Sequence, residues 1–107
     1  MLDHQNVIRL EGYFHDSENC YFLFELCEVG DLNSFIKDHG KLSIKLTRQF
    51  IMEIILALEY LKEVNVIHRD LKPKNILLDN TFHLKIADFG ASKVIDPEEV
   101  EQELALC

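Results

Sequence analysis

The sequence predicts an α+β fold within a single domain of 107 residues. Three observations support this prediction. A long segment with apolar residues at helical spacing occupies the middle of the chain. Short apolar segments with the composition of β-strands lie before and after it, separated by polar turns. The composition, with 48% hydrophobic and 28% charged residues, is typical of a globular protein.

The first expected elements form a β-hairpin over residues 7–26. Residues 7–14 and residues 20–26 are rich in the β-branched and aromatic residues that favour strands. The polar segment between them, residues 15–19, has the composition of a turn. We therefore expect two antiparallel strands joined by a short polar loop.

A short helix is expected after this hairpin. Asp31 has the residue type of an N-cap, and Leu32, Phe35 and Ile36 follow it at the spacing of one helix face. Gly40 is expected to end the helix, because glycine adopts the left-handed conformation that closes many helices.

Residues 43–63 show the strongest helical periodicity. Their apolar residues recur at intervals of three and four, as one face of a helix requires: Leu46, Phe50, Ile54, Leu58 and Leu61. Ile51 and Ile55 widen this face, so we expect a helix that is buried on most sides. Two short strands, residues 76–78 and 84–87, are expected after it across a turn at residues 79–81.

Charge and cysteine usage exclude several classes of protein. The net charge is −8, and residues 96–107 contribute −5 of it. This acidic balance argues against nucleic acid as a partner. No apolar run approaches the ~18 residues of a membrane span, and the first residues lack the features of a secretory signal. The three cysteines show no CxxC spacing, so we expect reduced thiols in an intracellular, cytoplasmic protein.

Two short motifs carry the chemistry. One reads His-Arg-Asp-Leu-Lys-Pro-Lys-Asn and ends at Asn75; the other, Asp-Phe-Gly, begins thirteen residues later at Asp88. Asp70 is a candidate proton acceptor, and Lys72 can hold a phosphate. Asn75 and Asp88 offer the oxygen ligands that Mg²⁺ prefers. Each could instead be an ordinary loop or turn residue, but together they are the groups that phosphoryl transfer requires.

The two motifs, in this order, resemble the signature of the protein kinase family and of its serine/threonine branch. The resemblance covers essentially the whole chain from His4 onward, and Lys72 favours serine/threonine over tyrosine specificity. It implies one incomplete protein kinase domain over residues 1–107. Residues 1–26 would be the end of the small-lobe sheet, and residues 27–107 the hinge, first helices and catalytic loop of the large lobe. Within the family, the sequence most resembles the phosphoinositide-dependent protein kinase group.

The resemblance also implies roles for individual residues. Asp70 would be the catalytic base, Lys72 would steady the γ-phosphate of ATP, and Asn75 with Asp88 would hold Mg²⁺. The implied ATP-binding residues are the gatekeeper Phe24, the hinge residues Glu25 and Cys27, Asp31 beside the ribose, Lys74 through its carbonyl, and Leu77 beneath the adenine. Leu10, His68 and Phe89 match three positions of the internal hydrophobic spine.

The implied partners are a protein substrate with a Ser or Thr acceptor and an upstream activating kinase. Arg69 implies regulation by phosphorylation, and the phosphorylation site is expected beyond Cys107. The glycine-rich loop, the strand lysine and its paired glutamate are expected upstream of His4, so the isolated chain is expected to be inactive.

Two other functions compete with this one. The first is a truncated, non-catalytic kinase-like module that binds partners or acts as a decoy. The second is a nucleotide-binding protein that acts on small molecules, which the Lys-Pro-Lys-Asn run disfavours.

Overall fold

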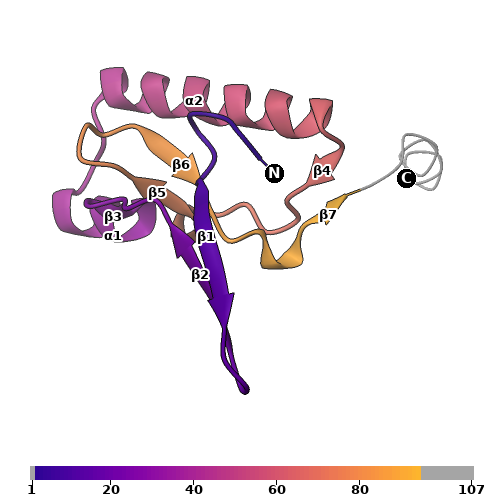
Figure 1. Ribbon diagram of the computed structural model, residues 1–107. Coiled ribbons are helices and arrows are strands. Elements are labelled where there is room, and N and C mark those ends of the chain that lie inside the picture. The colour runs from indigo at the N-terminus through magenta and orange to yellow at the C-terminus, as the bar shows by residue number, and fades with distance from the viewer. Residues whose placement is uncertain (1, 95–107) are drawn as a thin grey trace.

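The computed structural model describes residues 2–94 and has the mixed helix-and-strand architecture that the sequence predicts (Figure 1). The strands and helices, in chain order, are β1 (Leu10–His15), β2 (Cys20–Phe24), β3 (Gly30–Asp31), α1 (Leu32–His39), α2 (Ile44–Glu63), β4 (Val66–Ile67), β5 (Ile76–Leu78), β6 (Leu84–Ile86) and β7 (Lys93–Val94). Two single-turn 3₁₀ helices, Pro73–Asn75 and Phe89–Ala91, precede β5 and follow β6.

The expected hairpin is present as the antiparallel pair β1 and β2. Its turn is closed by Asp16, whose Oδ1 accepts hydrogen bonds from the N–H groups of Glu18 and Asn19 at 2.8 and 2.7 Å. The hairpin projects away from α2 (Figure 1), and every residue of β2 is exposed.

A second sheet, with strand order β3-β5-β6, lies under α2 and forms the centre of the molecule. Residues 6–8 run beside β6: the Ile86 N–H donates to the Asn6 carbonyl at 2.8 Å, and the Ile8 N–H donates to the Ile86 carbonyl at 2.9 Å. We expected Val7 and Ile8 in the hairpin. They lie instead against this sheet, where both are buried.

The caps of α1 are those that the sequence predicts. The Asp31 carboxylate accepts from the Ser34 N–H at 2.8 Å, and Gly40 ends the helix with φ at 72°. A residue with a side chain is strained at this φ, so glycine is the natural terminator.

Helix α2 is longer and lies across the central sheet (Figure 1). Phe50, Ala57 and Leu61 are buried, but Leu58, Ile51 and Ile55 are 40%, 53% and 46% exposed. The expectation that this helix is buried on most sides is therefore wrong for the structure. The described strands are short and cover one face of α2, so the opposite apolar face remains in contact with solvent.

The hydrophobic core lies between α1, α2 and the β3-β5-β6 sheet. Its buried members are Val7, Leu32, Phe35, Phe50, Ala57, Leu61, Ile76, Leu78, Leu84 and Ile86. Strands β4 and β7 form a separate antiparallel pair near the end of α2. Across residues 2–94, no helix has both the length and the apolar character required to cross a bilayer.

Candidate functional site

The segment that carries the first motif leaves β4 and is anchored by His68. This residue is only 4% exposed, and its Nε2 lies 2.7 Å from the Ala87 carbonyl. The Asp70 N–H lies 3.2 Å from Nδ1, an arrangement that requires Nδ1 to accept and Nε2 to donate. The ring also packs edge-on against Phe89, with centroids 4.8 Å apart. His68 therefore links the two motifs by packing and hydrogen bonding.

Two residues of the motifs adopt left-handed backbone conformations. Arg69 has φ at 69° and Asp88 has φ at 55°. Such conformations cost roughly 1–3 kcal/mol in a residue with a side chain, and they often occur at functional sites. Arg69 directly follows His68, and Asp88 directly follows Ala87. The contact between the His68 ring and the Ala87 carbonyl therefore lies next to both strained residues.

Asp70 is oriented by Asn75. The Asn75 Nδ2 donates to the Asp70 carbonyl oxygen at 2.8 Å and to its carboxylate Oδ2 at 3.2 Å. Asn75 is only 7% exposed, whereas the Asp70 side chain is 44% exposed. These two contacts fix the orientation of the buried amide and direct its oxygen away from Asp70.

Lys72 lies on the exposed side of Asp70. Its Nζ is 3.6 Å from Asp70 Oδ1, and the lysine side chain is 52% exposed. An ion pair this open to solvent contributes little to stability. The ammonium group is therefore able to turn toward a bound anion at small cost.

Asp88 is brought to the same place by the strand that precedes it. The Ala87 N–H donates to the Asn75 carbonyl at 2.8 Å, so the segments that carry Asn75 and Asp88 are hydrogen-bonded to each other. Asp88 is exposed. An amide oxygen and a carboxylate fit Mg²⁺, which usually takes one or two protein oxygens and shares the rest with phosphates and water. Within residues 2–94, His, Cys, Asp and Glu form no cluster of three or more that could hold a metal.

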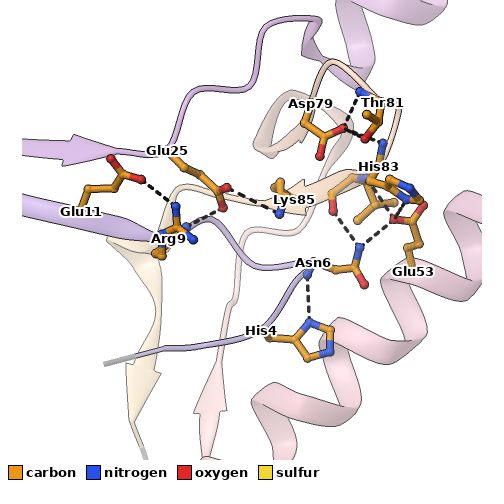
Figure 2. A network of polar contacts seen from close by, with 11 residues as sticks. His4, Asn6, Arg9, Glu11, Glu25, Glu53, Asp79, Thr81, His83 and Lys85 are labelled. Carbon is orange, nitrogen blue, oxygen red and sulfur yellow. Dashed lines mark hydrogen bonds and ion pairs between the residues drawn. The ribbon is translucent and has the colours of Figure 1, made fainter.

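The proposed hinge follows β2, at whose end Phe24 is 53% exposed. The Glu25 side chain turns inward: Oε1 accepts from the Arg9 N–H at 3.0 Å, and Oε2 lies 3.6 Å from Lys85 Nζ. Figure 2 shows this connection between the hairpin and β6. The Glu25 N–H also donates to the Arg9 carbonyl at 2.9 Å. These contacts fix the position of the backbone that the resemblance places along the adenine.

The remaining implied ATP-binding residues lie in β3 and β5 or in the segments just before these strands. Asp31 pairs with Leu77 across these strands, and Leu77 is half-buried. Hydrogen bonds from the Ser34 N–H and hydroxyl lower the pKa of Asp31. Burial raises the pKa of the half-buried Cys27, which supports a passive thiol over a reactive one. Lys74 is exposed on the 3₁₀ turn that precedes β5.

The structure thus brings Asp70, Lys72 and Asn75 together and joins Asp88 to them through Ala87. Phe24 belongs to the separate hairpin sheet, β1-β2, and not to the sheet that precedes Asp88.

A buried polar group that no motif of the sequence indicates lies between α2 and the beginning of β6. It consists of Asn6 and Glu53, which are 3% and 6% exposed and share a 2.7 Å hydrogen bond. One signal could have revealed it: Glu53 lies at helical spacing between Phe50 and Ala57, on the apolar face of α2.

Known proteins that are similar to this chain in sequence are protein kinases. A sequence model of the protein kinase domain matches residues 1–105. An Aurora kinase of Encephalitozoon cuniculi is 48% identical over 90 residues, which cover 83% of this chain and 33% of that protein. The 3-phosphoinositide-dependent protein kinase 1 of Homo sapiens is 43% identical over 97 residues, covering 91% of this chain and 17% of that protein. The 3-phosphoinositide-dependent protein kinase B of Dictyostelium discoideum is 47% identical over 92 residues, covering 86% and 10%.

The chain therefore spans a third or less of the length of these relatives. Serine/threonine kinases are prominent among the similar proteins, and the resemblance to the phosphoinositide-dependent group is confirmed as a similarity. Similarity to an Aurora kinase is of the same degree, so the subgroup stays a prediction. With two motifs joined in space and a match over nearly its whole length, this chain belongs to the protein kinase family.

Proposed function

We propose that this chain carries the catalytic loop and part of the ATP site of a serine/threonine protein kinase. The reaction would transfer the γ-phosphate of ATP to a Ser or Thr hydroxyl of a protein substrate. One observation carries the proposal: Asn75 binds Asp70 through its side chain and Ala87 through its carbonyl. A candidate base and two candidate metal ligands are thereby held in one rigid group, which is what phosphoryl transfer needs.

Asp70 is proposed as the catalytic base. Asn75 donates to one oxygen of the Asp70 carboxylate, Oδ2; the other, Oδ1, lies 3.6 Å from Lys72 Nζ, and the side chain is 44% exposed. A substrate hydroxyl can hydrogen-bond to Oδ1, which orients the hydroxyl for attack and accepts its proton. Lys72, on the same side, would bind the γ-phosphate and balance its developing negative charge.

Asn75 and Asp88 are proposed to hold Mg²⁺ together with the phosphates of ATP. When bound, Mg²⁺ neutralises phosphate charge during transfer. The protein contributes a buried amide with a fixed orientation and an exposed carboxylate on an adjacent segment. Asp88 lies one residue beyond the contact between Ala87 and Asn75, so the spacing of the two ligands is set by the backbone.

The adenine and ribose of ATP are proposed to lie between the hinge and β5. Phe24 would be the gatekeeper beside the adenine, the backbone of Glu25 and Cys27 would pair with the adenine edge, and Leu77 would lie beneath the ring. Asp31, opposite Leu77 in the sheet, would bind the ribose even though its oxygens also cap α1, because a carboxylate has several acceptor positions. Lys74 would contribute its backbone carbonyl.

The domain organisation is part of the same proposal. Residues 1–26 would be the small-lobe part, and residues 27–107 the hinge and part of the large lobe. The projecting hairpin and the separate central sheet support this division (Figure 1). An upstream activating kinase is the proposed regulator, because Arg69 precedes the proposed base. Cys20 and Cys27 are free thiols without CxxC spacing, which supports a cytoplasmic location.

The proposal is tested on the native protein. An antibody against residues 43–63 recovers it from its source cells, its mass is measured, and the recovered protein is assayed for transfer of ³²P from ATP to a Ser/Thr protein substrate in Mg²⁺. We expect a mass well above 12.5 kDa and transfer that Asp70→Asn and Asp88→Asn abolish. Asp38→Asn, at an exposed position of α1, is the matched control. Transfer that survives Asp70→Asn would overturn the proposed role of this residue.

The isolated 107-residue chain is proposed to be inactive in the same assay. The residues that it offers to the phosphates are Lys72, Asn75 and Asp88, which leave the opposite side of ATP open to water. Activity of the purified chain that Asp70→Asn abolishes would contradict this expectation.

The alternative function is a non-catalytic kinase-like binding or decoy module. The exposed apolar side chains of β2 and of the outer face of α2 favour it, since large exposed apolar patches mark interaction surfaces. A native mass of 12.5 kDa without kinase activity would make it the leading function.

A further inference from the structure

Glu53 is a charged residue inside the protein core, and the proposed kinase roles do not use it. It lies in the middle of α2 and is 6% exposed. A buried carboxylate is costly unless hydrogen bonds satisfy it. Its partners therefore show which parts of the molecule it holds.

Four donors surround the Glu53 carboxylate, and Figure 2 labels two of the residues that supply them, Asn6 and His83. Oε1 accepts from Gln49 Nε2 at 2.8 Å. Oε2 accepts from Asn6 Nδ2 at 2.7 Å and from the Leu84 N–H at 3.1 Å, and His83 Nδ1 lies 3.3 Å from the same oxygen. The donors come from the N-terminal segment, from α2 and from the beginning of β6. The carboxylate thus connects three segments that are far apart in the sequence.

Leu84, the first residue of β6, is held at both of its backbone polar groups on this side. Its N–H donates to Glu53, and its carbonyl accepts from Asn6 Nδ2 at 3.0 Å. Its side chain is completely buried. On the other side of the strand, Leu84 pairs with Leu78 of β5. On this side of β6, the side chains of Glu53 and Asn6 therefore supply the hydrogen bonds to the Leu84 backbone that a neighbouring strand would supply elsewhere in a sheet.

Backbone hydrogen bonds also hold the residues that follow Leu84. Ile86 is bonded to the backbone of residues 6 and 8, and the Ala87 N–H is bonded to the Asn75 carbonyl. Asp88 comes next in the chain. A strand fixed at its first residue and at its exit cannot slip without breaking these bonds, and a slip of one residue would turn each side chain to the opposite face.

We propose that Glu53 is a positioning residue for Asp88: by holding the first residue of β6, it fixes the course of the strand that places Asp88 beside Asn75. The metal-binding roles of Asp88 and Asn75 in this statement rest on the proposed function. The placement itself does not, so it can be tested without nucleotide or metal.

The test is residue-resolved amide hydrogen exchange on the ¹⁵N-labelled 107-residue chain. Glu53→Leu keeps a helix-forming side chain of similar size and removes the acceptor. We expect exchange at Leu84, Ile86 and Ala87 to become roughly tenfold faster, while the amides of α1 stay unchanged. The Ala87 amide is the decisive probe, because it reports the contact between the two proposed metal-binding segments and does not touch Glu53.

Two further variants complete the test. Glu53→Gln retains an oxygen acceptor and should keep exchange at Ala87 within about threefold of the wild type. Glu59→Leu makes the same change at an exposed position of α2 and is the matched control, with no expected effect at β6. If Glu53→Leu unfolds the chain, Glu53→Asp, which withdraws the carboxylate by one methylene, should give a smaller acceleration at the same three amides.

Three results would overturn the proposal. The first is faster exchange at Leu84 with no change at Ala87, which would make Glu53 a local contact only. The second is equal acceleration throughout the chain, which would make it a general stabiliser. The third is uniformly fast exchange in the wild type, which would leave no fixed strand to position. A positive result together with a failed kinase assay would retain the placement and reject only the metal roles.

Discussion

Replacement of Asn75 by alanine tests the central contact of the proposed site. The variant loses the 2.8 Å hydrogen bond to the Asp70 carbonyl and the 3.2 Å bond to its carboxylate. The first is worth about 1 kcal/mol. The second is discounted to about 1 kcal/mol as well, because Asp70 is 44% exposed and the bond is long. The free energy of unfolding should therefore fall by about 2 kcal/mol, which lowers Tm by about 10 °C in a domain of this size.

Thermal and urea unfolding followed by circular dichroism at 222 nm measure this change, since α1 and α2 supply the helical signal. Asn80→Ala, at an exposed turn position, is the matched control and should shift stability by less than about 0.5 kcal/mol. Asn75→Asp should destabilise at least as much as Asn75→Ala at neutral pH, because its oxygens would face those of Asp70. A loss from Asn75→Ala no larger than that from Asn80→Ala would refute the idea that this amide orients the proposed base.

Two other predictions follow from backbone strain and from charge. Because φ at Asp88 is 55°, Asp88→Gly should be about 1 kcal/mol more stable than Asp88→Ala in urea unfolding; the reverse order would contradict the left-handed conformation. Burial alone raises the pKa of Asp79, but hydrogen bonds from Thr81 and from the His83 N–H outweigh it and lower that pKa. This contribution to stability is present above the unfolded pKa of about 3.9 and disappears as the pH falls through the folded value. Asp79→Asn should therefore lose less stability than the wild type between pH 6 and pH 3, and an unchanged acid sensitivity would count against the turn.

Local sequence signals were sufficient for the helices but not for all strand pairing. Asp31 caps the beginning of α1 and Gly40 its end, and both interact only with residues nearby in the sequence. The beginning and end of this helix could therefore be predicted. Val7 and Ile8 have strand propensity, which indicates an extended conformation but does not identify the neighbouring strand. Their partner, Ile86, lies far along the chain, and only the folded arrangement shows that these residues belong with β6.

The apolar pattern of α2 predicted the helix correctly and its burial incorrectly, for one physical reason. Periodicity records which residues share a face, whereas burial depends on what covers that face. Phe50 and Leu61 lie against the central sheet, while Leu58 and Ile55 point to a side that no described strand covers. The apolar pattern therefore predicts that this segment forms a helix, but it does not predict which apolar side chains of the helix are buried.

The site shows a related contrast between residues that a motif marks and residues that support them. Asp70, Asn75 and Asp88 could be selected from the sequence because their order and spacing are characteristic. Glu53 carries only the weaker signal of its place among apolar residues at helical spacing, because a glutamate in a helix is usually exposed. One of its donors, Gln49, is four residues away on the same helix, but Asn6 and Leu84 are 47 and 31 residues away and reach the carboxylate only in the folded structure. The burial of Glu53 is thus a consequence of the tertiary fold, because only the fold brings the N-terminal segment and the beginning of β6 to this face of α2.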